Sequence, residues 1–284
     1  MAGIRTVTVD GLVFSTEGWT SPDGFTLWLD DLKGWDDGPA VRRDRVSRMG
    51  AHGEFSERGW RDARLVTLEG DAGAPTIEAA ALAAQQLAAV LGDGLAGVLD
   101  VTDTATVDMS AGAYLFADPK LSWKNDTTLT YQLQFWCPKP RKYGAAVNAI
   151  TGIASPGGGL TYPLDNPLDY GALGDPGTLT LTNTGTADTA PTFTVTGAMP
   201  NGFTITHVQS GQRLVYSAPI LPGQSVRLDS SDASVELDGY ADMSAKLTVR
   251  QWTRLARRTS GTWLFEAVGS TGATLTAEVR PAWW

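Results

Sequence analysis

The sequence has 284 residues, with 22 Lys and Arg against 31 Asp and Glu, which gives a formal net charge of −9. This length suits one large or two ordinary domains and allows a sizeable core without disulfides or a metal. The excess of carboxylates argues against a protein that coats DNA or an anionic membrane through bulk charge, but it leaves room for a small basic site. With Cys137 alone and only His52 and His207, neither an intrachain disulfide nor a thiolate–imidazole zinc site is expected.

No secretory signal is expected, because the first residues (MAGIRTVTVDG) contain no apolar run. No stretch reaches the ~18 apolar residues of a membrane span, so we expect a soluble protein made in a cytoplasm, without a membrane anchor. The composition favours a mainly β fold, since 32 glycines, 15 prolines and 10 tryptophans accompany many threonines.

The first predicted elements are strands. Val7, Val9, Leu12 and Phe14 alternate around Asp10-Gly11, which predicts a hairpin, and further strands are expected over 25–29 and 61–69. The intervening segment 34–60 is rich in glycine and charge. It is predicted to be a long loop or an extended arm, and long loops in compact chains tend to be functional or disordered.

One helix is predicted, over 76–91 (TIEAAALAAQQLAAVL), because alanine and leucine dominate this segment. Pro75 precedes it, Glu78 lies in the first turn and Gly92 follows as a stop signal. The face predicted to lie on a sheet carries Ile77, Ala81, Ala84, Leu87 and Leu91.

Strands are expected again at 97–101, 105–109, 112–117 and 127–136, and then the composition changes. Pro138 and Pro140 exclude a central strand, and 144–175 is poor in charge and rich in Gly, Pro and Asn. We therefore predict a first domain at 1–145, a linker at 146–175 and a second domain at 176–284.

The second domain is predicted to be a β-sandwich or jelly roll. Apolar residues alternate with threonines from Leu179 onward, and turn dipeptides such as Asn201-Gly202 and Asp238-Gly239 recur between the short strands. Short strands with turn signals at this spacing are typical of such folds.

Motifs that would carry chemistry are absent or misplaced, so we predict no catalytic, cofactor-binding or metal-binding residues. The glycines from Gly92 to Gly97 match G-x-G-x-x-G, but they follow a helix and precede a strand, which is the reverse of a nucleotide site. The carboxylates do not have the spacing of a calcium loop, and neither histidine has a local partner. These carboxylates and histidines are Asp30, Asp31, Asp36, Asp37, Asp229, Asp232, His52 and His207.

Two arginine runs and the tryptophans favour interfaces instead. In an acidic chain, arginines are more useful for protein contacts than for phosphate, and the runs are Arg42, Arg43, Arg45 and Arg48, and Arg254, Arg257 and Arg258. The tryptophans in strand-like contexts are predicted to lie in the core: Trp28, Trp123 and Trp136. Some of the tryptophans in loops and at the end of the chain are predicted to be anchors for another subunit, with coverage by their own loops as the alternative: Trp19, Trp35, Trp60, Trp283 and Trp284. Trp252 and Trp263 are predicted core residues, with stacking on a sugar ring as the alternative.

Turn and strand motifs also carry a family resemblance, and they occur at 158–164, 183–187, 191–197, 221–226, 235–239 and 280–284. In the first half, 135–144 is similar to the strand end and domain exit of the same family, although Cys137-Pro138 stands where that family often has Asp-Pro. On these motifs the chain resembles the distal tail proteins (minor tail proteins) of long-tailed phages, the siphoviruses, especially those of actinobacterial hosts.

This resemblance implies an N-terminal split-barrel-like β domain with one α-helix and a C-terminal galectin-like β-sandwich. It further implies a structural virion protein whose first domain builds a ring, usually a homo-hexamer. That ring joins the tail tube protein to the tail tip or baseplate and keeps a channel open for DNA. Implied neighbours are the tape measure and receptor-binding proteins of the tail tip, and some family members bind host polysaccharide. The location implied is the virion tail tip, after assembly in the host cytoplasm.

Two other functions stay open at this point. A carbohydrate-binding module for host cell-wall polysaccharide would show an exposed aromatic in a shallow groove. A glycan-active enzyme would need a pair of carboxylates spaced for acid and base roles. The ring protein predicts oligomers and no turnover.

Overall fold

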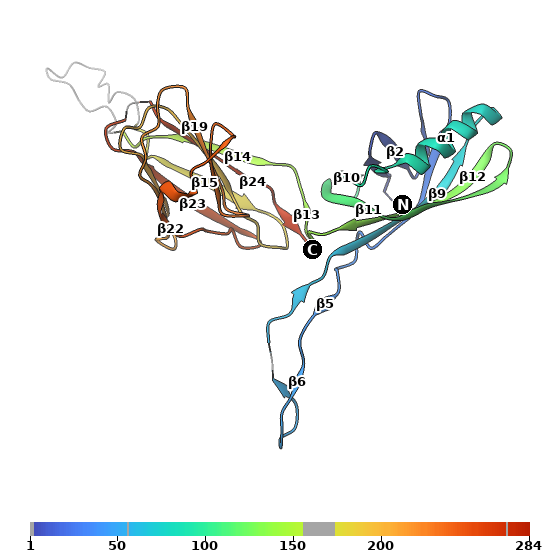
Figure 1. Cartoon of the computed structure of the whole chain (residues 1–284), viewed down its shortest axis with the longest axis horizontal. Helices are drawn as coiled ribbons and strands as arrows, with labels where there is room; N and C mark the ends of the chain where they lie inside the picture. Colours follow the sequence, from blue (N-terminus) through green and yellow to red (C-terminus); the bar gives the residue numbers. More distant parts are fainter. Residues whose placement is uncertain (1–2, 56, 156–173, 271) are drawn as a thin grey trace, which may run out of the picture. The chain divides into compact units, whose positions relative to one another are not determined.

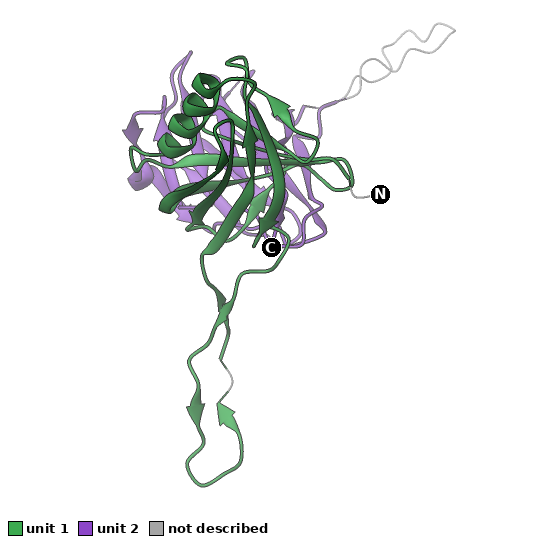
Figure 2. Cartoon of the chain, turned by 90° about the vertical axis from the view of Figure 1, so that its right-hand side faces the viewer, with its two compact units in different colours: residues 1–144, 284 green, residues 145–283 purple. Residues whose placement is uncertain are grey.

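The computed structural model describes residues 3–55, 57–155, 174–270 and 272–284. The chain folds into two compact units: unit 1 contains residues 1–144 and Trp284, and unit 2 contains residues 145–283 (Figure 2). Each unit has its own core. The motif at 158–164 and the Gly-rich run at 157–159 lie outside the described residues.

Unit 1 is a β-barrel with one helix among its described residues. Seven strands follow the order β10-β1-β2-β4-β9-β12-β11, and pairing of β10 with β11 closes the circle. All neighbours are antiparallel except β2 and β4, which share one parallel pair, Ser15 with Trp28. The short β3 pairs with β4, and β13 pairs with β11. The bounds are β1 Arg5–Val9, β2 Leu12–Ser15, β3 Trp19–Thr20, β4 Thr26–Lys33, β9 Arg64–Gly73, β10 Gly97–Asp103, β11 Met109–Asn125, β12 Thr128–Cys137 and β13 Lys142–Tyr143.

Strict alternation builds the core of the barrel. In β12, Leu129, Tyr131, Leu133 and Phe135 all point inward, and the Tyr131 ring lies 5.3 Å from that of Phe14 in β2. Helix α1, Ile77–Ala89, packs on the same core. Thr76 is its N-cap, and the Thr76 side chain accepts a hydrogen bond from the backbone amide of Ala79 at 3.2 Å.

The buried face of α1 differs from the predicted one. Ala80, Ala83 and Leu87 are buried, whereas Ile77 is largely exposed. In an alanine-rich helix the faces differ little in hydrophobicity, because alanine occurs on every side. The predicted face is correct at Leu87, which is buried, and at Ala84 and Leu91, which pack against the core, and it is wrong at Ile77 and Ala81, which are exposed.

The segment between β4 and β9 forms an arm that extends from the barrel (Figures 1 and 2). It is paired by two short antiparallel ladders, of β5 (Val41–Arg42) with β8 (Trp60–Arg61) and of β6 (Val46–Ser47) with β7 (Glu54–Phe55).

Unit 2 is a two-layer β-sandwich. One sheet has the order β14-β24-β16-β19-β20-β21 and the other β15-β23-β17-β18-β22. Their inner faces meet at Phe193 of β16 and Trp263 of β23, whose rings are 5.6 Å apart. The bounds are β14 Val147–Gly152, β15 Thr178–Asn183, β16 Thr192–Thr196, β17 Phe203–His207, β18 Arg213–Tyr216, β19 Ser225–Asp229, β20 Ser234–Leu237, β21 Ala241–Asp242, η1 Ser244–Lys246, β22 Leu247–Arg250, β23 Thr259–Glu266, β24 Thr274–Val279 and β25 Ala282–Trp283. The mainly β fold class, with a barrel, one helix and a sandwich, is confirmed.

The predicted linker at 146–175 requires a correction. Its first residues form β14, which pairs with β24 from Val147 opposite Val279 to Gly152 opposite Thr274. Gly and Pro are concentrated after residue 155, so the composition of the whole window concealed the strand-forming sequence VNAITG at its start.

Candidate assembly surface

The arm, residues 38–62, is the most exposed part of unit 1. The ladders β5–β8 and β6–β7 contain two residue pairs each. A two-stranded hairpin is marginally stable in water by itself. The conformation of the arm therefore depends on its attachment to the barrel and on any surface that it contacts.

Side chains on the arm combine apolar and cationic character. Phe55 and Trp60 are 59% and 58% exposed. The guanidinium of Arg48 lies 5.4 Å from the Phe55 ring, and that of Arg58 lies 4.5 Å from the Trp60 ring. The arm carries six arginines against four carboxylates, whereas the remainder of unit 1 carries sixteen carboxylates against eight Lys and Arg. The arm is thus a basic segment on an acidic body.

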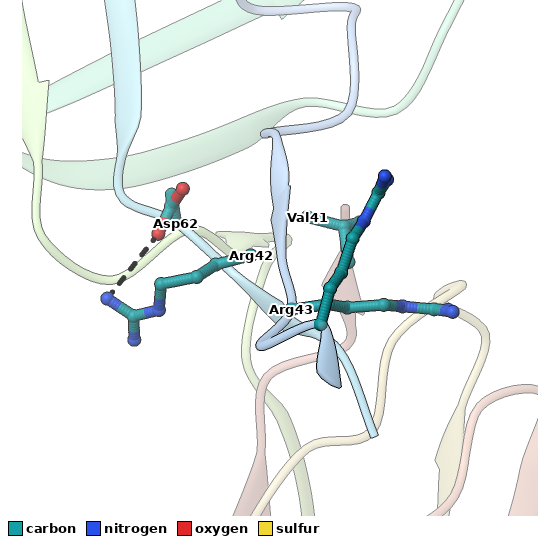
Figure 3. Close-up of a pocket in the computed structure, with 5 residues that line it drawn as sticks. Val41, Arg42, Arg43 and Asp62 are labelled. Atoms are coloured by element: carbon teal, nitrogen blue, oxygen red, sulfur yellow. Dashed lines mark ion pairs between the residues drawn. The ribbon is translucent and has the colours of Figure 1, made fainter. Parts of the chain in front are cut away.

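Three arginines of the first predicted run, Arg42, Arg43 and Arg45, line an open concavity at the start of the arm, with Val41 and Asp62 (Figure 3). Arg42 reaches the Asp62 carboxylate at 3.7 Å, whereas Arg43 points away from it. Exposed ion pairs of this kind contribute little to stability. These arginines are therefore available for contact with another molecule.

Two buried cations attach the arm to the barrel. Arg64 and Lys142 are only 2% and 4% exposed. Arg64 Nη1 donates to the backbone carbonyls of Gly34, Trp35 and Asp37, at 3.0 Å for Trp35 and 2.7 Å for Asp37. Lys142 Nζ donates to the same Trp35 carbonyl at 2.7 Å. Both cations thus hold the segment 34–37, which leads into the arm.

Burial shifts the pKa values around this attachment. Loss of solvation, together with the positive charge of Arg64, lowers the pKa of Lys142 to about 8. Burial raises the pKa of the neighbouring Cys137 thiol to about 11, against a smaller opposing effect of Arg64. A thiol with a raised pKa is a poor nucleophile, so Cys137 acts as a packing residue.

Three predicted core tryptophans instead lie on the outside of the barrel. Trp28, Trp123 and Trp136 are all exposed. Trp28 and Trp136 occupy outward positions of their strands, whereas Trp123 lies opposite the buried Leu129 near the exposed end of β11. Trp136, for example, directly follows the inward Phe135, and successive strand residues face opposite sides. The prediction of core positions for these residues was wrong.

Trp136 belongs to an apolar patch on the barrel wall that spans four strands. It pairs with Leu65 of β9 and with Tyr114 of β11, whose ring lies 5.8 Å away. Val98 of β10 pairs with Gly112, two residues before Tyr114, and is also exposed. We call Leu65, Val98, Tyr114 and Trp136 the wall patch. Contiguous exposed apolar residues of this kind mark interaction surfaces.

The tryptophans predicted to lie in loops differ in their exposure to solvent. Trp60 is exposed on the arm, Trp19 is half-buried, and Trp35 is buried under its own loop. In unit 2, Trp263 is 1% exposed and Trp252 packs against the core, so stacking of Trp263 on a sugar ring is excluded.

The other candidate residues lie apart from one another. Gly92 and Gly97 border the turn between α1 and β10, at the wrong end of the helix for a phosphate. Asp36 pairs with Arg5, Asp31 lies near Lys33, Asp229 pairs with Arg227, and Asp232 accepts from Ser234. Asp30, Asp37, His52 and the second arginine run (Arg254, Arg257 and Arg258) are exposed, and His207 contacts Ser210 and the Trp263 ring. Within the described ranges, no group of three or more His, Cys, Asp or Glu side chains could hold a metal ion.

In the same part of the chain, no helix is long and apolar enough to cross a membrane.

Comparison with known proteins adds an independent observation. Residues 184–283, which form most of unit 2, match the family described as the siphovirus-type tail component, C-terminal domain. The C-terminal domain belongs to this tail family. The predicted resemblance to distal tail proteins of siphophages is thereby confirmed, and the chain is a structural component of a phage tail. The actinobacterial host stays a prediction.

Solved structures extend the similarity in fold to the whole chain. The Dit protein of phage SPP1, described as a paradigm of the hub adsorption apparatus in phages that infect Gram-positive bacteria, has a TM-score of 0.66 at 14% identity, over 96% of this chain and 98% of that one. A chain of the phage P2 baseplate in its activated conformation with Ca has a TM-score of 0.52 at 11% identity, over 98% of both chains. At these identities the likeness concerns the fold. No curated protein sequence matches the chain.

Proposed function

We propose that this protein is the subunit of a closed ring, a hexamer, that joins the tail tube protein to the tail tip or baseplate and leaves a channel for DNA. The observation that carries the proposal is the arm, a basic and apolar segment of low intrinsic stability that is attached to an acidic barrel. A ring requires two different patches on each subunit that fit one another. The arm is one such patch, and the barrel of the next copy supplies the other.

Charge supports this pairing. The arm has an excess of arginines and the barrel an excess of carboxylates, so neighbouring copies attract when the arm of one meets the barrel of the next. The net negative charge of the chain also suits a DNA channel, because an acidic wall releases no counterions from DNA and so does not retain it.

The two similar proteins are described as parts of a hub and of a baseplate. By extension, we infer a position at the virion tail tip after assembly in the host cytoplasm, with tape measure and receptor-binding proteins as further neighbours. We infer no catalytic role and no cofactor, in line with the structural role of the family.

Sedimentation velocity and negative-stain electron microscopy of the purified full chain test the proposal. We expect particles with cyclic symmetry that increase with protein concentration. A variant in which two glycines replace 41–61 should stay monomeric and keep the melting temperature of the barrel. Tyr240→Ser, at an exposed turn of unit 2, serves as the control and should assemble normally. A full chain that is monomeric at every concentration and that occupies no ring in virions would contradict the proposal.

A further inference from the structure

Trp284 lies in unit 1, although the residue before it belongs to unit 2. Its ring is within reach of two guanidinium groups: Cζ of Arg141 lies 5.1 Å from the ring centroid and Cζ of Arg61 lies 5.4 Å from it. Both distances are typical of cation–π contacts. One half-buried aromatic ring therefore holds two cations that are far apart in the sequence.

Arg61 connects the ring to the arm. It is the last residue of β8, and its Nη1 donates to the carbonyl of Pro39 at 2.6 Å, just before β5 begins. The next backbone amide, of Asp62, donates to the carbonyl of Ala40 at 2.9 Å. Arg61 thus joins the two strands of the arm at the point where they leave the barrel.

Arg141 connects the same ring to the buried attachment of the arm. It lies between Pro140, whose carbonyl accepts from Arg64 Nε at 3.3 Å, and Lys142, which donates to Trp35. The Nε of Arg141 is buried and has no hydrogen-bond partner in the described structure. Contact with an aromatic face is one of the few ways to accommodate such a guanidinium, because the π face attracts the cation without a hydrogen bond.

We propose that Trp284 is a positioning residue for the arm. By holding Arg61 and Arg141 together, its ring fixes the direction in which the arm leaves the barrel. The link to assembly rests on the proposed function: a fixed arm loses less conformational freedom when it meets a second copy, which favours ring closure. The positioning itself does not depend on ring formation.

Hydrogen–deuterium exchange at a concentration where the chain is monomeric tests the positioning directly. In Trp284→Ala, exchange of the amides at 38–62 should accelerate by roughly tenfold, the effect expected from the loss of one or two cation–π contacts. Trp284→Phe should restore most of the protection because it keeps an aromatic face. Trp123→Ala, which removes an exposed tryptophan elsewhere on the barrel, is the matched control and should leave the arm unchanged.

Arg61→Lys provides a second variant that keeps the charge and a donor for Pro39 but loses the planar group that stacks on the ring. It lies on the exposed arm, so the barrel should fold normally, and we expect faster exchange here as well. Unchanged exchange in both Trp284→Ala and Arg61→Lys would overturn the inference, whether or not the chain forms rings. Faster exchange together with normal rings would support the positioning role of Trp284 and count against the link between a fixed arm and ring closure.

Discussion

At the scale of single residues, the most informative feature is the pair of buried cations beside Trp35. Arg64 and Lys142 both donate to backbone carbonyls, and within the described part of the chain neither forms an ion pair with a carboxylate. Burial of a charge is costly unless hydrogen bonds replace water. The hydrogen bonds to backbone carbonyls offset part of this cost, and they hold the segment that leads into the arm.

A pH dependence of stability follows for Lys142. Its pKa is about 8 in the folded chain against an ordinary value of 10.5. Between these values the unfolded chain binds more protons, so the free energy of unfolding should rise with pH as Lys142 loses its proton. From pH 7 to pH 9 this group should add about 1 kcal/mol.

Denaturant unfolding of Lys142→Met at pH 7 and pH 9 measures this contribution. The variant should lack this part of the rise, and the exposed Lys139→Met should keep it. The comparison stops at pH 9 because the pKa of the Cys137 thiol is raised in the folded chain. Above that pH the unfolded chain loses the thiol proton first, which lowers the free energy of unfolding. Identical pH profiles for wild type and Lys142→Met would contradict the expectation.

At the scale of elements, α1 and the arm contrast. The helix has strong local signals, namely Thr76 at its start and alanine and leucine along its length. The arm has four strands of two residues each and therefore no comparable local stability. Local sequence can specify the helix, but the arm depends on its attachment.

Thr76→Ala should destabilise the helix at its first turn. The Thr76 hydroxyl accepts from the backbone of Ala79, and loss of such a cap reduces the free energy of unfolding by about 1 kcal/mol. Chemical denaturation measures the change, and Thr76→Ser is the control because it retains the acceptor oxygen. Equal losses for Ala and Ser would show that the hydroxyl contributes nothing.

At the scale of the whole molecule, the two units have separate cores, and β14 belongs to the second one. Val147–Gly152 covers the edge of β24, and Ala149 and Ile153 pack against the sandwich core. The beginning of the predicted linker is therefore structural.

A fragment of residues 145–283 should unfold cooperatively as a soluble monomer. A fragment of 176–284 should be less stable by about 2 kcal/mol, because it loses a strand and leaves β24 as an open edge. Thermal and denaturant unfolding of both fragments measures the difference. Equal stability would mean that β14 does not stabilise the sandwich. A ring formed by either fragment would contradict the assignment of ring formation to the first domain.

The sequence alone determined the features that depend on near neighbours. Alternation in the hairpin of Val7 to Phe14, in 127–136 and after Leu179 specified strands, and the alanine-rich segment specified the helix, because period and propensity are local properties. Turn motifs in the second half were sufficient for the resemblance to tail proteins. The reversed position of Gly92 to Gly97 was likewise visible from element order.

Only the tertiary structure decided which sides are buried and which distant residues meet. The exposure of Trp136 depends on which face of β12 points into a closed barrel, and the wall patch depends on the register of four strands. The buried role of Arg64 and Lys142 had no signal in the sequence, because charged residues are normally exposed. The contacts of Trp284 with Arg61 and Arg141 join residues that are far apart in the sequence, and long-range pairing of this kind is set by how the chain folds back on itself.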